Sequence, residues 1–132
     1  MMTLAQAHTL IMQRCMDFPH SVAIQYPNQP DFTPPNDKWC RVSIQYADTQ
    51  PAGFNTVGLC ERDGGYVNIQ CFAQKGKGDI PLTQLADQWR AWFKGYRSGN
   101  FEVTITHAPT EPYPDLDGDY VMSLVRIEFR VN

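Results

Sequence analysis

The sequence predicts an α+β fold: a mostly antiparallel mixed sheet of about five to six strands, with two helices packed on one of its faces. Two kinds of pattern predict this fold. In residues 40–46, 66–73 and 121–131, apolar and polar residues alternate, which is the period of strands with one covered face. In residues 82–96, apolar residues recur at the spacing of an amphipathic helix. We therefore expect the helices to cover the apolar face of the sheet.

Length and composition are those of one folded domain that spans residues 1–132. A domain of this size buries roughly two thirds of the surface that its unfolded chain exposes, which is enough for a core. The 42% apolar and 19% charged residues distinguish the chain from disordered ones. The net charge of −3, with scattered Lys and Arg, gives no basic footprint for nucleic acid. Without a visible export signal or the roughly 20 apolar residues of a membrane span, we expect a soluble protein made in the cytosol.

In the N-terminal third, residues 3–16 predict a short helix that faces the sheet, with Thr3 as its N-cap and Pro19 beyond its end. One stripe of this helix carries Leu4, Ala7, Ile11 and Cys15. Residues 22–26 predict a brief strand. Residues 27–37 hold four prolines and predict an extended loop, because proline lacks the backbone donor of a ladder.

The middle of the chain predicts two strands and an irregular connection. The covered face of the strand at residues 40–46 carries Cys40, Val42, Ile44 and Tyr46. Residues 47–58 have no periodicity and predict a protruding loop or a hairpin arm. The Asp63-Gly64 dipeptide is a hairpin signal, and it predicts that residues 59–62 fold back against residues 66–73. One face of that second strand carries Val67, Ile69 and Cys71.

The main helix follows a Lys-Gly-Lys-Gly-Asp turn at residues 75–79. Its apolar stripe comprises Leu82, Leu85, Ala86, Trp89, Phe93 and Tyr96. Asp79 suits the N-cap, and Pro81 suits a first turn that has no use for its own N–H. The break at the C-terminus of the helix is expected at Ser98-Gly99-Asn100.

Two further alternating segments predict the last strands of the sheet. The apolar positions of the first are Phe101, Val103 and Ile105, and those of the second are Val121, Val125, Ile127, Phe129 and Val131. Residues 107–119 lie between them and predict a long surface loop, because they are polar and rich in proline.

Three patterns that suggest a ligand have simpler structural interpretations. The turn at residues 75–79 lacks the spacing of a phosphate-binding loop, so we interpret it as a structural turn. The acidic run at residues 115–119 has its glycine in the wrong place and lacks the bidentate Glu of a calcium loop. Trp89 and Trp92, beside Phe93, could form a stacking platform, but their spacing is that of a core-facing helix, with Trp92 at its margin.

Cysteines and histidines likewise define no site. The cysteines are Cys15, Cys40, Cys60 and Cys71, and they lack CxxC spacing, so free thiols are favoured over a zinc site or disulfides. The histidines His8, His20 and His107 are far apart, and no serine lies in a nucleophile elbow. We therefore predict no catalytic, cofactor-binding or metal-binding residues, no cofactor, and a protein that is not an enzyme.

The elements follow one another in a recognisable order. After the first helix and the proline-rich loop come Trp39-Cys-Arg-Val-Ser-Ile, a long loop, Gly64-Gly-Tyr-Val-Asn-Ile-Gln-Cys-Phe, Gly76-Lys-Gly78, the amphipathic helix, and a final strand with Tyr120 and Phe129. This order resembles the tail-terminator-like (tail completion) proteins of long-tailed bacteriophages, of the lambda type. The resemblance covers nearly the whole chain and rests on the order of short motifs and on the strand–Gly-x-Gly–helix junction.

The resemblance implies a structural protein of a phage or prophage, found in the virion tail and made in the cytoplasm of the bacterial host. Such subunits form a six-membered ring that caps the tail tube, stops tube polymerisation and provides a head-attachment surface. The implied partners are copies of the chain, the tail tube protein and the head–tail connector protein, with no nucleic-acid sequence recognition and no membrane.

Two loops are the expected contact regions of such a ring. We expect residues 47–58 to face the tube or the ring lumen and residues 109–119 to meet a neighbouring subunit. A salt-dependent contact is also expected between the basic turn at residues 75–79 and the acidic loop at residues 115–119.

Two alternatives to a tail terminator remain from the sequence. Another neck or head–tail completion protein would have a similar fold and no chemistry. A small cytosolic ligand-binding domain or enzyme would use the concave sheet face and a histidine. A deep pocket that held His107 beside a carboxylate at hydrogen-bond distance would favour this second alternative.

Overall fold

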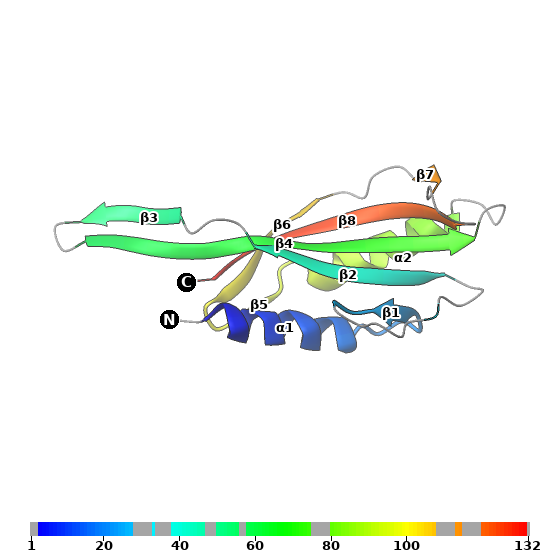
Figure 1. Ribbon diagram of the computed structural model, residues 1–132, viewed down its shortest axis with the longest axis horizontal. Coiled ribbons are helices and arrows are strands. Elements are labelled where there is room, and N and C mark those ends of the chain that lie inside the picture. Colours follow the sequence, from blue (N-terminus) through cyan, green and yellow to red (C-terminus); the bar gives the residue numbers. More distant parts are fainter. Residues whose placement is uncertain are drawn as a thin grey trace.

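A mixed sheet runs the length of the protein, and both helices contribute to one core on a single face of that sheet (Figure 1). The computed structural model describes residues 3–27, 33, 38–46, 50–55, 58–74, 80–107, 113–114 and 120–131. For residues 50–55, 58–63, 113–114 and 120 it describes the backbone alone. The predicted α+β fold is confirmed.

The described residues form two helices and eight strands. The helices are α1 (Leu4–Met16) and α2 (Ile80–Phe93). The strands are β1 (Ala23–Gln25), β2 (Trp39–Tyr46), β3 (Gln50–Asn55), β4 (Gly58–Gln74), β5 (Arg97–Ser98), β6 (Phe101–His107), β7 (Tyr113–Pro114) and β8 (Tyr120–Val131). Six of them follow the order β1-β2-β4-β8-β6-β5, while β3 pairs with β4 and β7 pairs with β8. The β1–β2 pair is parallel, and the other pairs are antiparallel.

Helix α1 begins after Thr3, as predicted, with a reciprocal cap. The Thr3 hydroxyl accepts a hydrogen bond from the backbone N–H of Gln6 at 3.1 Å, and the Gln6 side-chain oxygen accepts one from the backbone N–H of Thr3 at 2.8 Å. This capping box satisfies two groups that the helix itself leaves unpaired. Ala7, Ile11 and Cys15 are buried, whereas Leu4 is 37% exposed, so the covered stripe begins one turn later than predicted.

Helix α2 buries the predicted stripe but ends earlier than predicted. The buried residues are Leu82, Leu85, Ala86, Trp89 and Phe93. The helix ends at Phe93, because Gly95 has a φ of +74°, a left-handed conformation that stops the helical ladder. A Cβ added at Gly95 would meet nothing within 4 Å, so backbone conformation and not crowding favours glycine there. Tyr96 packs on the core from beyond the helix end. The segment predicted as the break starts with Ser98, the last residue of β5, and continues into the turn at Gly99.

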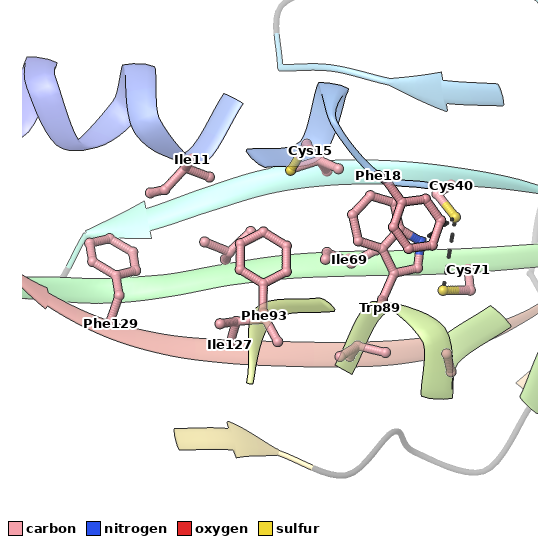
Figure 2. Packing of buried hydrophobic residues seen from close by; sticks show 14 of the residues in the cluster. Ile11, Cys15, Phe18, Cys40, Ile69, Cys71, Trp89, Phe93, Ile127 and Phe129 are labelled. Carbon is pink, nitrogen blue, oxygen red and sulfur yellow. Dashed lines mark hydrogen bonds between the residues drawn. The ribbon is translucent and has the colours of Figure 1, made fainter. Parts of the chain in front are cut away.

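The core fills the space between the helices and the apolar face of the sheet, as the alternating patterns predict. Figure 2 shows α1 residues on one side, α2 residues on the other, and sheet residues between them. The Phe18 ring stacks on Trp89 with the ring centroids 3.8 Å apart. The buried sheet residues are Cys40, Val42, Val67, Ile69, Cys71, Ala73, Phe101, Val125, Ile127, Phe129 and Val131.

The prediction of a hairpin turn at Asp63-Gly64 is wrong. β4 is one strand of 17 residues that passes through both positions and pairs with β8 there. The two glycines Gly64 and Gly65 serve a close approach of neighbouring strands. A Cβ added at Gly64 would lie 2.8 Å from the carbonyl oxygen of Phe129, and one added at Gly65 would lie 2.2 Å from that of Gln45. A side chain does not fit at either distance, so β4 needs glycine where the backbones of β8 and β2 approach it closely.

Strand β6 departs from its predicted alternation halfway along. Phe101 and Val103 pair with core positions of β8, but the register shifts between Val103 and Ile105. A bulge of this kind sends the following side chains to the opposite face. Ile105 is therefore 49% exposed on the face without helices, where it pairs with Glu128.

The C-terminal ends of α1 and α2 are joined by reciprocal hydrogen bonds between Arg14 and Trp92. Arg14 donates from Nη2 to the backbone oxygen of Trp92 at 2.6 Å, and the Trp92 indole N–H donates to the backbone oxygen of Arg14 at 2.8 Å. Both acceptors lie in last helical turns, where carbonyls have no partner within the helix. The guanidinium also lies 3.6 Å from the Trp92 ring centroid and 4.3 Å from that of Tyr96. The margin position predicted for Trp92 is thus a helix–helix contact.

Replacing Arg14 with methionine should reduce the free energy of unfolding by about 1.5–3 kcal/mol, because a charged hydrogen bond to a carbonyl is lost. Trp92→Phe removes the other hydrogen bond and should cost about 1 kcal/mol. The two losses should not add, because the side chains contact each other. Urea unfolding of the single and double variants measures this coupling, with the exposed Lys94→Met as control. Additive losses would contradict the reciprocal contact.

Several predicted features lie wholly or mainly outside the described residues. These are the proline-rich loop at residues 27–37, the glycine turn with its Asp79 cap, and most of the loop at residues 107–119. Within that last loop, β7 pairs with β8, so a short part of it belongs to the sheet. Among the described residues, no helix is both long and apolar enough to cross a membrane.

Candidate assembly surfaces

The face of the sheet opposite the helices, here called the open face, is mostly polar. Its register places side chains of β2, β4, β8 and β6 in cross-strand rows. One row is Ser43, Asn68, Arg126 and His107, and the next is Gln45, Tyr66, Glu128 and Ile105. These residues are exposed or half-buried, which distinguishes them from the buried positions that alternate with them.

A charged row crosses the open face beside Gly64. Glu102 lies between two cations: Arg130 pairs with its Oε1, and the Nε of Arg97 lies 3.6 Å from its Oε2. The Glu102 side chain is 19% exposed, whereas that of Arg97 is 73% exposed. Exposed ion pairs contribute only about 0–1 kcal/mol, so this row orients side chains more than it stabilises the fold.

His107 lies beside a carboxylate on the open face, with its Nε2 3.5 Å from Oε2 of Glu128. The two side chains are 44% and 36% exposed. Next to them, Arg126 lies 5.1 Å from the Tyr66 ring centroid and donates from Nε to Oδ1 of Asn68 at 3.2 Å. The separation exceeds the roughly 2.6–3.2 Å of the hydrogen bond that the enzyme alternative requires, and both side chains are open to water.

A small aromatic cluster occupies the end of the open face away from Gly64. The Trp39 and Phe72 rings stack with centroids 4.2 Å apart, and both residues are buried, as is Met122. The Arg41 guanidinium lies 5.4 Å from each ring centroid, within the range of a cation–π contact. The alternating pattern predicts polar residues on this face, so the cluster is a second core that periodicity did not indicate.

The arm, formed by β3 and residues 58–62 of β4, extends beyond the rest of the sheet (Figure 1). Pairing of β4 with β8 begins only at Asp63, so in the described chain residues 58–62 pair with β3 alone. This confirms the hairpin arm that the sequence left as one of two alternatives. A two-stranded hairpin by itself is marginally stable in water, so a partner would stabilise the arm.

The buried thiols belong to the core. Cys40 and Cys71 are cross-strand partners with their sulfurs 4.0 Å apart, and the Trp89 indole N–H donates to the Cys40 sulfur at 3.2 Å (Figure 2). Cys15, Cys40 and Cys71 are free, as predicted, while the side chain of Cys60 is outside the described part. Burial, with a smaller contribution from Cys40, raises the pKa of Cys15 to about 12. The hydrogen bond with Cys40, then burial, raises the pKa of Cys71.

These shifts predict a loss of stability in alkaline solution. The folded chain holds the Cys15 proton up to about pH 12, whereas an ordinary thiol releases it near pH 9. Between these values the unfolded state binds fewer protons, so the free energy of unfolding should fall as pH rises. Urea titrations from pH 8 upward measure the slope, which should be smaller in Cys15→Ala. An unchanged slope in that variant would contradict the assignment.

The histidines do not converge on a common site. His8 shares a hydrogen bond with the Tyr46 hydroxyl at 3.2 Å, His20 lies beside the Phe18 ring, and His107 faces Glu128. Within the described ranges, no group of three or more His, Cys, Asp or Glu residues is arranged to hold a metal ion. The basic turn and the acidic loop, for which a salt-dependent contact is predicted, lie outside those ranges.

An α+β subunit with a polar open face and a projecting arm is a form suited to assembly with other proteins. The family model described as phage tail terminator protein matches residues 4–129. The chain belongs to this family and is a structural component of a phage tail. No curated protein matches it. One solved structure, of a protein with no functional designation, aligns over 100% of this chain and 97% of its own, with a TM-score of 0.74 and 17% identity. At that identity the likeness concerns the fold.

Proposed function

We propose that this chain, acting as one domain over residues 1–132, forms a ring that caps the phage tail tube, stops tube polymerisation and presents a surface to the head–tail connector. The match of the family over residues 4–129 carries this proposal. A six-membered ring and a lambda-type arrangement are parts of the same proposal, as is synthesis in the host cytoplasm from a phage or prophage genome.

The geometry supports an assembling subunit that performs no chemistry. The arm projects from the sheet where a neighbouring protein can reach it (Figure 1). His107 and Glu128 are the side chains that most resemble a catalytic acid–base pair, and both are exposed to water. A head-to-tail contact between unlike surfaces closes into a ring when the rotation between subunits allows it.

Within the ring, we assign residues 47–58 to the side that faces the tube or the lumen, and the loop at residues 109–119 to a neighbouring subunit. Loops and extensions on a rigid sheet are the usual carriers of such contacts. Tube contact through the arm would also account for a hairpin that the subunit alone supports poorly.

The function is tested by adding purified protein to tail tube protein while the tube polymerises. Substoichiometric amounts should shorten the tubes, because one ring blocks one growing end, and labelled protein should appear at tube ends in negative-stain images. Heat-unfolded protein is the control. Tubes of unchanged length, or label spread along the tube walls, would contradict a capping function.

A further inference from the structure

Among the strand edges of the described chain that have unpaired backbone, two combine accessibility with a favourable composition, and they lie on different parts of the subunit. The first is the outer edge of β6. β5 pairs with its first two residues, and the backbone N–H of Val103 donates to the oxygen of Tyr96 at 2.9 Å. Beyond that point, no described segment pairs with the outer edge of residues 104–107. The edge consists of Thr104, Ile105, Thr106 and His107.

The β6 edge has a composition that favours strand addition. Exposed edges in natural proteins are usually blocked by Lys, Pro, inward charges or bulges. Here a bulge lies at the start of the edge, between Val103 and Ile105, but residues 104–107 include neither Lys nor Pro, and three of the four are β-branched. Ile105 adds an apolar side chain that is 49% exposed.

The second unpaired edge belongs to the arm, on the side of β4 away from β3. Residues 58–62 retain all their backbone N–H groups, because none of them is proline. The opposite side of the arm is less suitable, since β3 contains Pro51 and its register is irregular between Pro51 and Gly53. The edge of β2 beyond β1 is also less accessible, because α1 lies along that side of the sheet (Figure 1).

We propose that the β4 edge of the arm of one subunit, residues 58–62, pairs with the β6 edge of a second copy of this chain, residues 104–107. Adding a strand satisfies backbone groups on both partners. The two edges are different surfaces of one chain, so each subunit gives an arm to one neighbour and receives an arm from the other, which is the head-to-tail contact of a ring. This inference rests on the proposed ring, and it names the contact that closes it.

The native Cys60 allows a direct test in purified tails. Ile105→Cys and Thr106→Cys are made singly, because successive strand residues point to opposite faces and one of them should share a face with Cys60. A short bismaleimide should then link neighbouring subunits into a ladder on a denaturing gel. The other three cysteines are buried and should not compete. Asp87→Cys, on the exposed side of α2, is the matched control and should remain monomeric.

The outcomes separate this contact from the proposed function. A ladder with Ile105→Cys or Thr106→Cys, lost on adding Cys60→Ser and absent in Asp87→Cys, would support the pairing. Tails of normal length whose subunits form no ladder with either variant would overturn the pairing and leave capping intact. If the chain without substitutions gave tails of uncontrolled length and formed no rings on them, both the pairing and the proposed capping function would be overturned.

Discussion

Replacing Gly65 with alanine should destabilise the subunit by about 3 kcal/mol or more, at the upper end of the usual cost of overpacking. The added Cβ would lie 2.2 Å from the carbonyl oxygen of Gln45 and 2.9 Å from the Cα of Tyr46. Both contacts are with backbone atoms of β2, so no side chain can rotate away to relieve them. The sheet itself would have to shift at the base of the arm.

Urea unfolding measures this effect, and Gly95→Ala is its matched control. Gly95 needs a positive φ but has open space around it, so alanine there should cost only about 1–2 kcal/mol. A Gly65→Ala variant that is no less stable than Gly95→Ala would show that β2 and β4 are not closely packed at this point.

Deleting residues 49–62 should abolish capping while leaving the subunit folded. The deletion removes β3 and the arm part of β4, and it joins β2 to β4 by a four-residue connection between Tyr46 and Gly65, which are already paired. In the described part of the chain, β3 and residues 58–62 pair only with each other, so their removal should leave the core unaffected. Tails made with the shortened chain should therefore vary in length as if the protein were absent.

Two measurements are needed to interpret this deletion. Circular dichroism and thermal unfolding of the shortened chain should give a midpoint within a few degrees of that of the full chain, which corresponds to a change of about 1 kcal/mol. Tail lengths are then counted by negative-stain imaging. Normal tail lengths with a folded, shortened chain would show that the arm takes no part in capping.

Local patterns predicted most of the elements because the helices and central strands each bury one regular face. The stripe from Leu82 to Phe93 and the alternation from Val125 to Val131 needed only the spacing of apolar residues. Thr3 was recognised because an N-cap is set by its immediate neighbours. The order of these elements indicated the family, and the family match over residues 4–129 confirms it.

The errors arose where distant segments decide a local conformation. The Asp63-Gly64 dipeptide is typical of a hairpin turn, but a glycine also suits a close approach of strands, and the sequence does not distinguish the two. The bulge before Ile105 and the early helix end at Gly95 leave no periodic signal that distinguishes them from regular structure. The contact between Arg14 and Trp92 joins residues 78 positions apart, and no spacing rule indicates it.

Tail length in phage particles made without this chain tests the account most directly. Tails from a deletion strain should be tubes of widely varying, mostly excessive length that carry no heads. Complementation with the full chain should restore one length and head attachment. Headed tails of normal length in the deletion strain would contradict the claim that this protein ends the tube.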